Sequence, residues 1–246
     1  MADSFSIVAG AGDVNGDGYC DLAVGARLED PRGRQGAGTV RLFHGSASGI
    51  GTTVATLLEG LNANDQFGVT VARAGDVNGD GFDDLLVGAS LASPGGRVSA
   101  GTAALFLGAN GGLATTSARL YEGLAAGDRL GVAVGGGGDV NGDGLDDYLV
   151  GAFRASPGAS ASAGSASVFH GSGGGLPTVA TIVLAGAGET TSAGPSRAPR
   201  RMEYGDGVGS WGQGARHLGW AASMRGARGR WIVWRTVNVG WDHPRS

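Results

Sequence analysis

The sequence has no lysine, a single cysteine and no long apolar run. All 18 basic residues are arginines, a bias that indicates a GC-rich coding sequence more than a function. Cys20 has no partner in the chain, so an intramolecular disulfide is excluded. No run of about 18 apolar residues occurs, and no membrane span is expected. The first residues also lack the basic and apolar regions of a secretory signal.

Glycine, in contrast, is abundant, and the charge is unevenly distributed. The 51 glycines and 7 prolines make up about a quarter of the chain, which is close to the level that indicates disorder in sequences without a period. Residues 1–190 hold 9 arginines against 19 acidic residues, a net charge of −10. Residues 191–246 hold 9 arginines against 3 acidic residues, a net charge of +6, and they contain all five tryptophans.

One oxygen-rich stretch occurs three times, at intervals of 63 residues. It reads GDVNGDGYCDLAVGA from Gly12, GDVNGDGFDDLLVGA from Gly75 and GDVNGDGLDDYLVGA from Gly138. Each copy places oxygen-bearing side chains at positions 1, 3, 5 and 9 of a nine-residue loop. The three sets are Asp13, Asn15, Asp17 and Asp21; Asp76, Asn78, Asp80 and Asp84; and Asp139, Asn141, Asp143 and Asp147.

This donor set predicts a calcium ion in each loop, about three in all. Three carboxylates and one amide oxygen, without His or Cys, suit a hard cation. The backbone carbonyl at position 7, from Tyr19, Phe82 or Leu145, would supply a further ligand whose side chain is free to vary. Calcium accepts such a set more readily than magnesium, which demands a stricter octahedron. The alternative is an Asp/Asn/Gly turn that binds no ion.

The loops differ from the EF-hand type of calcium loop. An EF-hand closes with a bidentate Glu at position 12 and continues into a helix. Position 12 here is Val24, Val87 or Val150. Each loop runs instead into a short apolar segment that ends at a glycine, which is typical of a buried strand.

The repetition extends beyond the loops. A strand with alternating apolar residues is expected before each loop, and the apolar segment after it predicts a second strand. Third strands are expected from Gly38, Gly101 and Gly164, and fourth strands at 53–59, 116–122 and 179–185. Tandem four-stranded antiparallel units are typical of β-propeller blades. We therefore predict an all-β fold: a partial β-propeller of about three blades at 3–64, 65–127 and 128–190.

These features together resemble the FG-GAP repeat family, the blade type of the integrin alpha-subunit propeller. The FG element is Phe67-Gly68, with Leu130-Gly131 and Phe5-Ser6 as departures in the other copies. The GAP element is Gly25-Ala26, Gly88-Ala89 and Gly151-Ala152, without its proline. The resemblance covers about residues 3–190. It implies calcium in the loops and a role in adhesion or ligand binding, usually outside the cell or at its surface.

The resemblance leaves two classes of function open. The first is a non-catalytic module that binds a protein or polysaccharide ligand. The alternative is an accessory domain of a secreted enzyme that acts on polysaccharide or phospholipid. No Ser/His/Asp or Cys/His set is found, so we expect no catalysis. His44 and His170 fall on equivalent positions, but Leu107 occupies the third, which favours packing over a metal-binding ring.

The pattern fails after residue 190. The stretch from Met202 aligns with the loops, but its first, third and ninth positions are Met202, Tyr204 and Ser210, so no calcium site is expected. Residues 191–246 are either a diverged fourth blade, with a strand from Trp231 to Trp234, or a disordered or frame-shifted tail. No nucleic-acid partner is expected. Three blades cannot close a ring, since propellers close with about 4–8, which suggests a fragment of a larger propeller.

Overall fold

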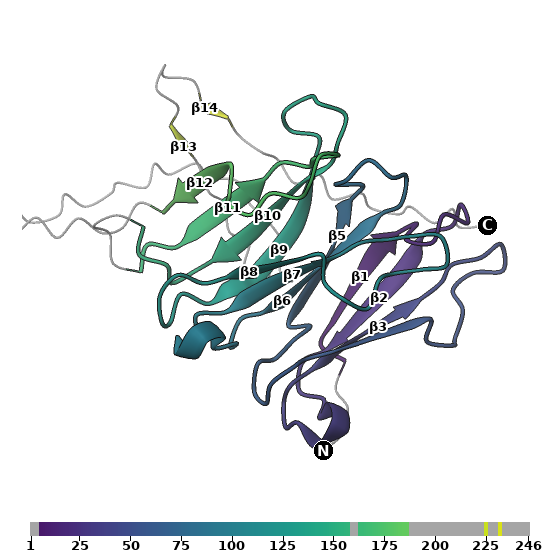
Figure 1. Cartoon of the computed structure of the whole chain (residues 1–246), viewed down its shortest axis with the longest axis horizontal. Helices are drawn as coiled ribbons and strands as arrows, with labels where there is room; N and C mark the ends of the chain where they lie inside the picture. Colours follow the sequence, from purple (N-terminus) through teal and green to yellow (C-terminus); the bar gives the residue numbers. More distant parts are fainter. Residues whose placement is uncertain (1–4, 158–161, 187–223, 226–230, 233–246) are drawn as a thin grey trace, which may run out of the picture. The chain divides into compact units, whose positions relative to one another are not determined.

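The computed structural model describes residues 5–157, 162–186, 224–225 and 231–232. The chain divides into two compact units, Met1–Ala193 and Gly194–Ser246, and each is described by itself. The first unit contains three sheets (Figure 1). Within the described ranges, no helix has the length and apolar character needed to cross a membrane.

Each of the three sheets is a four-stranded antiparallel meander in which neighbours along the chain pair with each other. Blade 1 consists of β1 (Ile7–Gly12), β2 (Asp21–Ala26), β3 (Thr39–Phe43) and β4 (Thr56–Glu59). Blade 2 consists of β5 (Thr70–Gly75), β6 (Asp84–Ala89), β7 (Thr102–Phe106) and β8 (Arg119–Glu122). Blade 3 consists of β9 (Leu130–Gly138), β10 (Asp147–Ala152), β11 (Ser165–Phe169) and β12 (Ile182–Ala185). The predicted all-β fold with three four-stranded blades is confirmed.

The connection between the second and third strands carries a short element that the sequence did not predict. A 3₁₀ turn, η1 (Pro31–Gly33), follows β2, and η2 (Pro94–Gly96) follows β6. Both begin with a proline, whose fixed φ suits the first position of a helical turn. Arg34 and Arg97, which follow these turns, donate hydrogen bonds to the fourth strand's Glu59 and Glu122.

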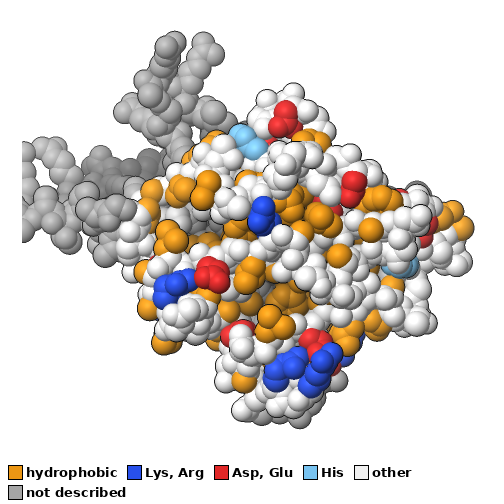
Figure 2. Space-filling view, viewed as in Figure 1, with side chains coloured by type: hydrophobic (Ala, Val, Ile, Leu, Met, Phe, Trp, Pro, Cys, Tyr) orange, Lys and Arg blue, Asp and Glu red, His pale blue; other side chains and the backbone are white. Residues whose placement is uncertain are grey.

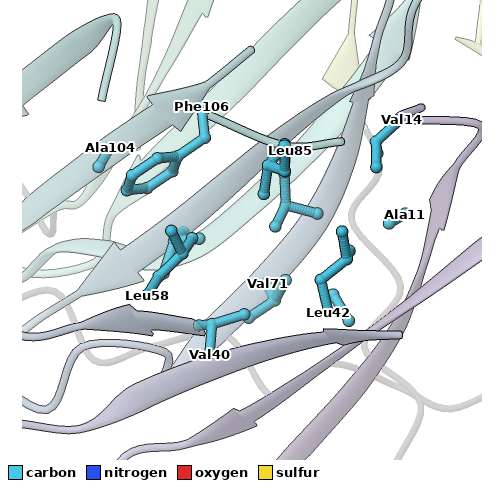
Figure 3. Packing of buried hydrophobic residues seen from close by; sticks show 12 residues of the cluster. Ala11, Val14, Val40, Leu42, Leu58, Val71, Leu85, Ala104 and Phe106 are labelled. Atoms are coloured by element: carbon cyan, nitrogen blue, oxygen red, sulfur yellow. The ribbon is translucent and has the colours of Figure 1, made fainter. Parts of the chain in front are cut away.

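Blades 1 and 2 share one hydrophobic core (Figure 3). Alternate residues of a strand point to opposite faces of the sheet. Blade 1 packs against blade 2 through one face of its sheet, and blade 2 uses the other face of its own sheet for this contact. The large side chains of this core include Val40, Leu42 and Leu58 from blade 1, and Val71, Leu85, Val87 and Phe106 from blade 2. Ala11 of β1 and Ala23 of β2 are also buried in this core.

Blades 2 and 3 share a second core that is richer in aromatic residues. Tyr148 and Phe169 of blade 3 stack with their ring centroids 5.3 Å apart. Tyr121 of blade 2 packs against Phe169, and its hydroxyl lies 2.6 Å from the hydroxyl of Tyr148. Burial raises the pKa of Tyr148 far above its ordinary value, so both phenols stay neutral and hydrogen-bonded.

Burial at equivalent positions depends on whether a following blade covers the sheet. Leu58 and Tyr121, one repeat apart, are 3% and 6% exposed, whereas Leu184, the next residue in this series, is 43% exposed. Figure 2 shows hydrophobic side chains on the surface between scattered charged groups. Because burial of a leucine-sized side chain contributes about 1.5–3 kcal/mol, the outer face of blade 3 lacks stabilisation that the inner faces have.

In the second unit the structure describes two short strands, β13 (Met224–Arg225) and β14 (Trp231–Ile232), which pair antiparallel. The expected Trp231–Trp234 strand is therefore described only for its first two residues. Most of residues 191–246, including the loop-like stretch from Met202, lies outside the described residues, so the choice between a diverged blade and a tail stays a prediction.

Candidate functional site

The three predicted loops connect the first two strands of each blade. In blade 1, β1 ends at Gly12 and β2 begins at Asp21, and these two residues pair with each other. A bulge between Gly10 and Gly12 interrupts the register just before the loop. Blades 2 and 3 have the same pairing and irregularity at the equivalent places. Each nine-residue loop is thus closed at its base by a strand pair. We name them loop 1 (13–21), loop 2 (76–84) and loop 3 (139–147).

The aspartate at position 1 organises the loop backbone. In loop 1, Asp13 Oδ1 accepts hydrogen bonds from the amides of Gly16 and Asp17 at 2.7 and 3.0 Å, and Oδ2 accepts from Gly18 at 2.7 Å. Gly16 and Gly18 have φ values of +75° and +87°, which favour glycine. Asp76 and Asp139 make the same three bonds in their loops. In loop 3 these bonds, led by that from Gly144, lower the pKa of Asp139.

Positions 3 and 5 bond to each other at the exposed side of the loop. The side-chain amide of Asn15 donates through Nδ2 to Asp17 Oδ2 at 2.9 Å, and Asp17 Oδ1 accepts from the backbone amide of Tyr19 at 2.9 Å. The bond from Asn15 is the main reason that the pKa of Asp17 is lowered. Loops 2 and 3 repeat this arrangement with the same partners. The carboxylate of Asp17 therefore stays ionised at neutral pH.

The aspartate at position 9 is buried beneath each loop. Asp21 Oδ2 accepts from the Val14 amide at 3.0 Å, and Oδ1 accepts from the Gly45 amide at 2.8 Å. Asp84 and Asp147 have the equivalent two partners. Burial raises the pKa of Asp84 to about 7, and the negative charges of Asp80 and Asp76 add to the rise. No arginine is paired with these three carboxylates in the described part of the chain.

The side chains have the right chemistry for a calcium ion but are not gathered around one point. Across the described residues, no group of three or more His, Cys, Asp or Glu side chains is arranged to hold a metal ion. The donors are nevertheless all oxygens, the set a hard cation prefers. A buried carboxylate without a cationic partner is costly to ionise, and a bound cation would remove that cost at Asp84. The residues therefore fit calcium, provided that binding draws the outer carboxylates inward.

The structure reveals a further residue with a role at the loops, the aspartate at position 8. Asp83 and Asp146 do not belong to the predicted ligand sets, yet each bonds to the loop of the preceding blade. Cys20 occupies this position in blade 1 and is exposed. The 63-residue period places these residues in register, but nothing in the sequence indicates that their partners lie in another blade.

A buried histidine nitrogen and an apolar cleft are two further features of the blades outside the loops. His44 Nε2 is buried without a hydrogen-bond partner among the described residues. Among the described residues His44 belongs to no group of side chains that could hold a metal ion, and its expected packing role stays a prediction. A cleft of about 430 Å³ lies between blades 1 and 2, lined by apolar groups such as Phe67 and Phe106 and by the carboxylates of Glu59 and Glu122. Arg34 and Arg97 pair with these two carboxylates.

Comparison with known proteins identifies the repeat. The family model described as FG-GAP repeat matches residues 5–43 and 67–106, which span the first three strands and the loop of blades 1 and 2. These two segments of the chain match FG-GAP repeats. The third copy, in which the FG element is Leu130-Gly131 and β9 contains a run of glycines, lies outside the matched ranges.

Curated relatives of these FG-GAP repeats are integrin alpha subunits. The chain is 31% identical to integrin alpha-5 of Xenopus laevis over 161 residues. It is 35% identical to integrin alpha-IIb of Mus musculus over 162 residues and 35% identical to integrin alpha-V of Gallus gallus over 161 residues. These matches cover 62–63% of this chain but only 15% of each relative. The expected resemblance to integrin alpha propeller repeats is confirmed.

Proposed function

We propose that the chain is a calcium-binding β-propeller module that serves adhesion or ligand binding and has no catalytic activity. The observation that carries the proposal is the identical bonding pattern of three loops whose donors are all oxygens. In each, a position-1 carboxylate folds the backbone and a buried position-9 carboxylate lacks a cationic partner. The similarity to integrin alpha subunits supports the adhesive role and a location outside the cell or at its surface.

In this proposal each loop residue has a distinct task. The carboxylates at positions 1, 5 and 9 and the amide oxygen at position 3 would hold the ion, together with the carbonyl at position 7. No described residue donates a hydrogen bond to the carbonyl of Tyr19, Phe82 or Leu145, so these oxygens are free to bind a cation. The position-9 residue opens the second strand, and a bound ion would therefore fix the loop to the start of that strand.

The proposed role of calcium is structural. Calcium sites in extracellular modules have dissociation constants of about 10⁻⁴–10⁻³ M. At millimolar calcium each site would then stabilise the folded state by about 1 kcal/mol, because only the folded chain binds the ion. Three such sites amount to a sizeable part of the about 5–15 kcal/mol by which domains are stable.

The exposed apolar face of blade 3 supports the further proposal that additional blades complete the propeller. The burial of Leu58 and Tyr121 depends on a following sheet, and Leu184 would be buried by another of the same kind. The blade boundaries at 3–64, 65–127 and 128–190 remain part of this proposal. The ligand would be a protein or a polysaccharide, and the cleft beside Phe67 and Phe106 is a candidate contact surface.

Thermal unfolding of the full chain with calcium and with chelator tests the proposal. Calcium should raise the melting temperature, and Asp80→Ala should remove about a third of that rise while changing little in chelator. Asp30→Ala, outside the loops, serves as the matched control and should leave the calcium-dependent rise intact. A melting temperature that is the same with calcium and with chelator would contradict the proposal, as would an equal loss for Asp80→Ala in both conditions.

A further inference from the structure

Loop 1 is held by a residue of the following blade. The amide of Asp13 donates a hydrogen bond to Asp83 Oδ2 at 2.7 Å, and the amide of Asp83 donates to the Asp13 carbonyl at 3.0 Å. Both main-chain groups of the residue at position 1 are therefore fixed by a single residue of blade 2. Because Asp13 also folds the loop through its carboxylate, its backbone position sets the position of the whole loop.

The same pair of bonds occurs between blades 2 and 3. The Asp76 amide donates to Asp146 Oδ2 at 3.0 Å, and the Asp146 amide donates to the Asp76 carbonyl at 3.1 Å. The glycine before each held residue leaves room for the carboxylate: a Cβ built at Gly12 or Gly75 would collide with the carboxylate of Asp83 or Asp146. The contact is thus a repeated feature of the interface between blades.

Two further contacts from the following blade cover each held loop. The ring of Phe82 lies over Gly16, where a Cβ would be 2.6 Å from a ring carbon, and Leu145 lies over Gly79 in the same way. In addition, the carbonyl at position 2 of each loop accepts a main-chain hydrogen bond from the residues after the following blade's third strand. These bonds are Ala109 to Val14 at 3.0 Å and Ser172 to Val77 at 2.8 Å.

Loop 3 provides an internal comparison, because no following blade covers it among the described residues. Val14 and Val77 at position 2 are 0% exposed, whereas Val140 is 57% exposed. A Cβ built at Gly138 meets no atom within 4 Å. The internal bonds of loop 3 nevertheless match those of the other loops. The fold of a loop therefore does not require the following blade, although the placement of loops 1 and 2 involves it.

We propose that Asp83 and Asp146 are positioning residues for the cation sites of the preceding blades, so that the sites in loops 1 and 2 are each built from two blades. This inference rests on the proposed calcium function. Asp83 also forms an ion pair with Arg73 at 2.7 Å, which offsets its charge. It therefore acts on loop 1 by fixing the backbone and not by attracting the cation directly.

The expected size of the effect follows from outer-shell contacts in metal sites in general. Removing a residue that orients a metal ligand typically weakens metal binding by about 10–100-fold. Asp83 holds the backbone of a ligand and not its side chain, so we expect about a tenfold weakening at loop 1. Asparagine retains an oxygen that can accept the Asp13 amide, so Asp83→Asn should recover most of the affinity.

Loop 1 can be observed separately because its position-7 residue is Tyr19, where loops 2 and 3 have Phe82 and Leu145. Terbium substitutes for calcium and emits when a nearby tyrosine is excited. The part of the emission that Tyr19→Phe abolishes in the full chain reports loop 1 alone. The experiment titrates terbium into the full chain carrying Asp83→Ala, Asp83→Asn or Asp146→Ala, and measures the half-saturation of this Tyr19-dependent signal.

The proposal predicts a half-saturation about tenfold higher for Asp83→Ala, within about twofold of the unmodified chain for Asp83→Asn, and unchanged for Asp146→Ala. An unchanged value for Asp83→Ala would overturn it while leaving the proposed calcium function standing. Equal shifts for Asp83→Ala and Asp146→Ala would also overturn it, since they would indicate general destabilisation. Absence of any Tyr19-dependent signal in the unmodified chain would contradict the proposed calcium function itself. This inference, which rests on that function, would then be contradicted as well.

Discussion

Replacing Asp84 with asparagine should remove most of the pH dependence of stability that loop 2 confers in calcium-free solution. The Asp84 side chain is fully buried, and its carboxylate accepts hydrogen bonds from the amides of Val77 and Gly108. Asparagine has nearly the same size and keeps one accepting oxygen, but it carries no charge at any pH. The hydrogen bond that asparagine loses costs the same at every pH, so the change in pH dependence isolates the cost of ionising this buried group.

The direction of the effect follows from the pKa of Asp84, which is raised from 3.8 to about 7 in the folded state. The folded chain holds this proton more tightly than the unfolded chain. The stabilisation by protonation is fully present below the unfolded pKa and is lost as the pH rises through the folded pKa. Between the two values the slope is about 1.4 kcal/mol per pH unit. From pH 5 to pH 7, Asp84 should thus lower the free energy of unfolding by about 2 kcal/mol.

Calcium should reverse this trend, because the cation binds the ionised carboxylate and competes with the proton. The stabilisation by calcium should therefore grow between pH 5 and pH 7 in the unmodified chain, and much less in Asp84→Asn. The variant should be at least as stable as the unmodified chain in calcium-free buffer at pH 7, and less stable when millimolar calcium is present.

Urea denaturation followed by circular dichroism at pH 5, 6 and 7 measures the free energy of unfolding of both proteins, in calcium-free and in calcium-containing buffer. The difference between the two proteins removes the contribution of other titrating groups. If Asp84→Asn showed the same pH dependence as the unmodified chain without calcium, the reasoning about the buried carboxylate would be refuted. A variant that lost stability equally with and without calcium would refute the link to cation binding.

Two paired substitutions test the role of the following blade in packing. Gly75→Ala should destabilise the fold more than Gly138→Ala. Both glycines have positive φ, but only a Cβ at Gly75 collides with a neighbouring carboxylate. Equal losses of unfolding free energy in chemical denaturation would argue against that contact. Leu58→Ala should cost about 2–5 kcal/mol, as is usual for a buried leucine. Leu184→Ala should cost about 1 kcal/mol or less, since its side chain is 43% exposed. Comparable melting temperatures for the two leucine variants would contradict the inferred difference in packing.

The fold could be predicted from the sequence largely because it repeats. A single DVNGDG segment is compatible with an ordinary turn, but three copies in register, each followed by a short apolar segment, indicate a strand–loop–strand unit. The alternation around Val71 and Val134 identifies the first strand of a blade, and the glycine that closes each apolar segment marks the end of the second. Local pattern and period thus carry the information for the three sheets.

Contacts between blades could not be predicted in the same way. Asp83 has the same local sequence context whether its carboxylate faces solvent or the Asp13 amide, and only the packing of two sheets brings the residues together. The raised pKa of Asp84 likewise depends on burial beneath the loop, which the spacing of its carboxylates does not reveal. The 3₁₀ turns at Pro31 and Pro94 are too short to produce a periodic pattern.

The central claim, that the three loops hold calcium, is tested most directly by equilibrium dialysis of the full chain against radioactive calcium. A variant with Asp17, Asp80 and Asp143 all replaced by alanine is the matched control. The account predicts saturable uptake of about three ions at millimolar calcium or below, and little or none by the triple variant. No uptake by the unmodified chain, or equal uptake by both proteins, would contradict it.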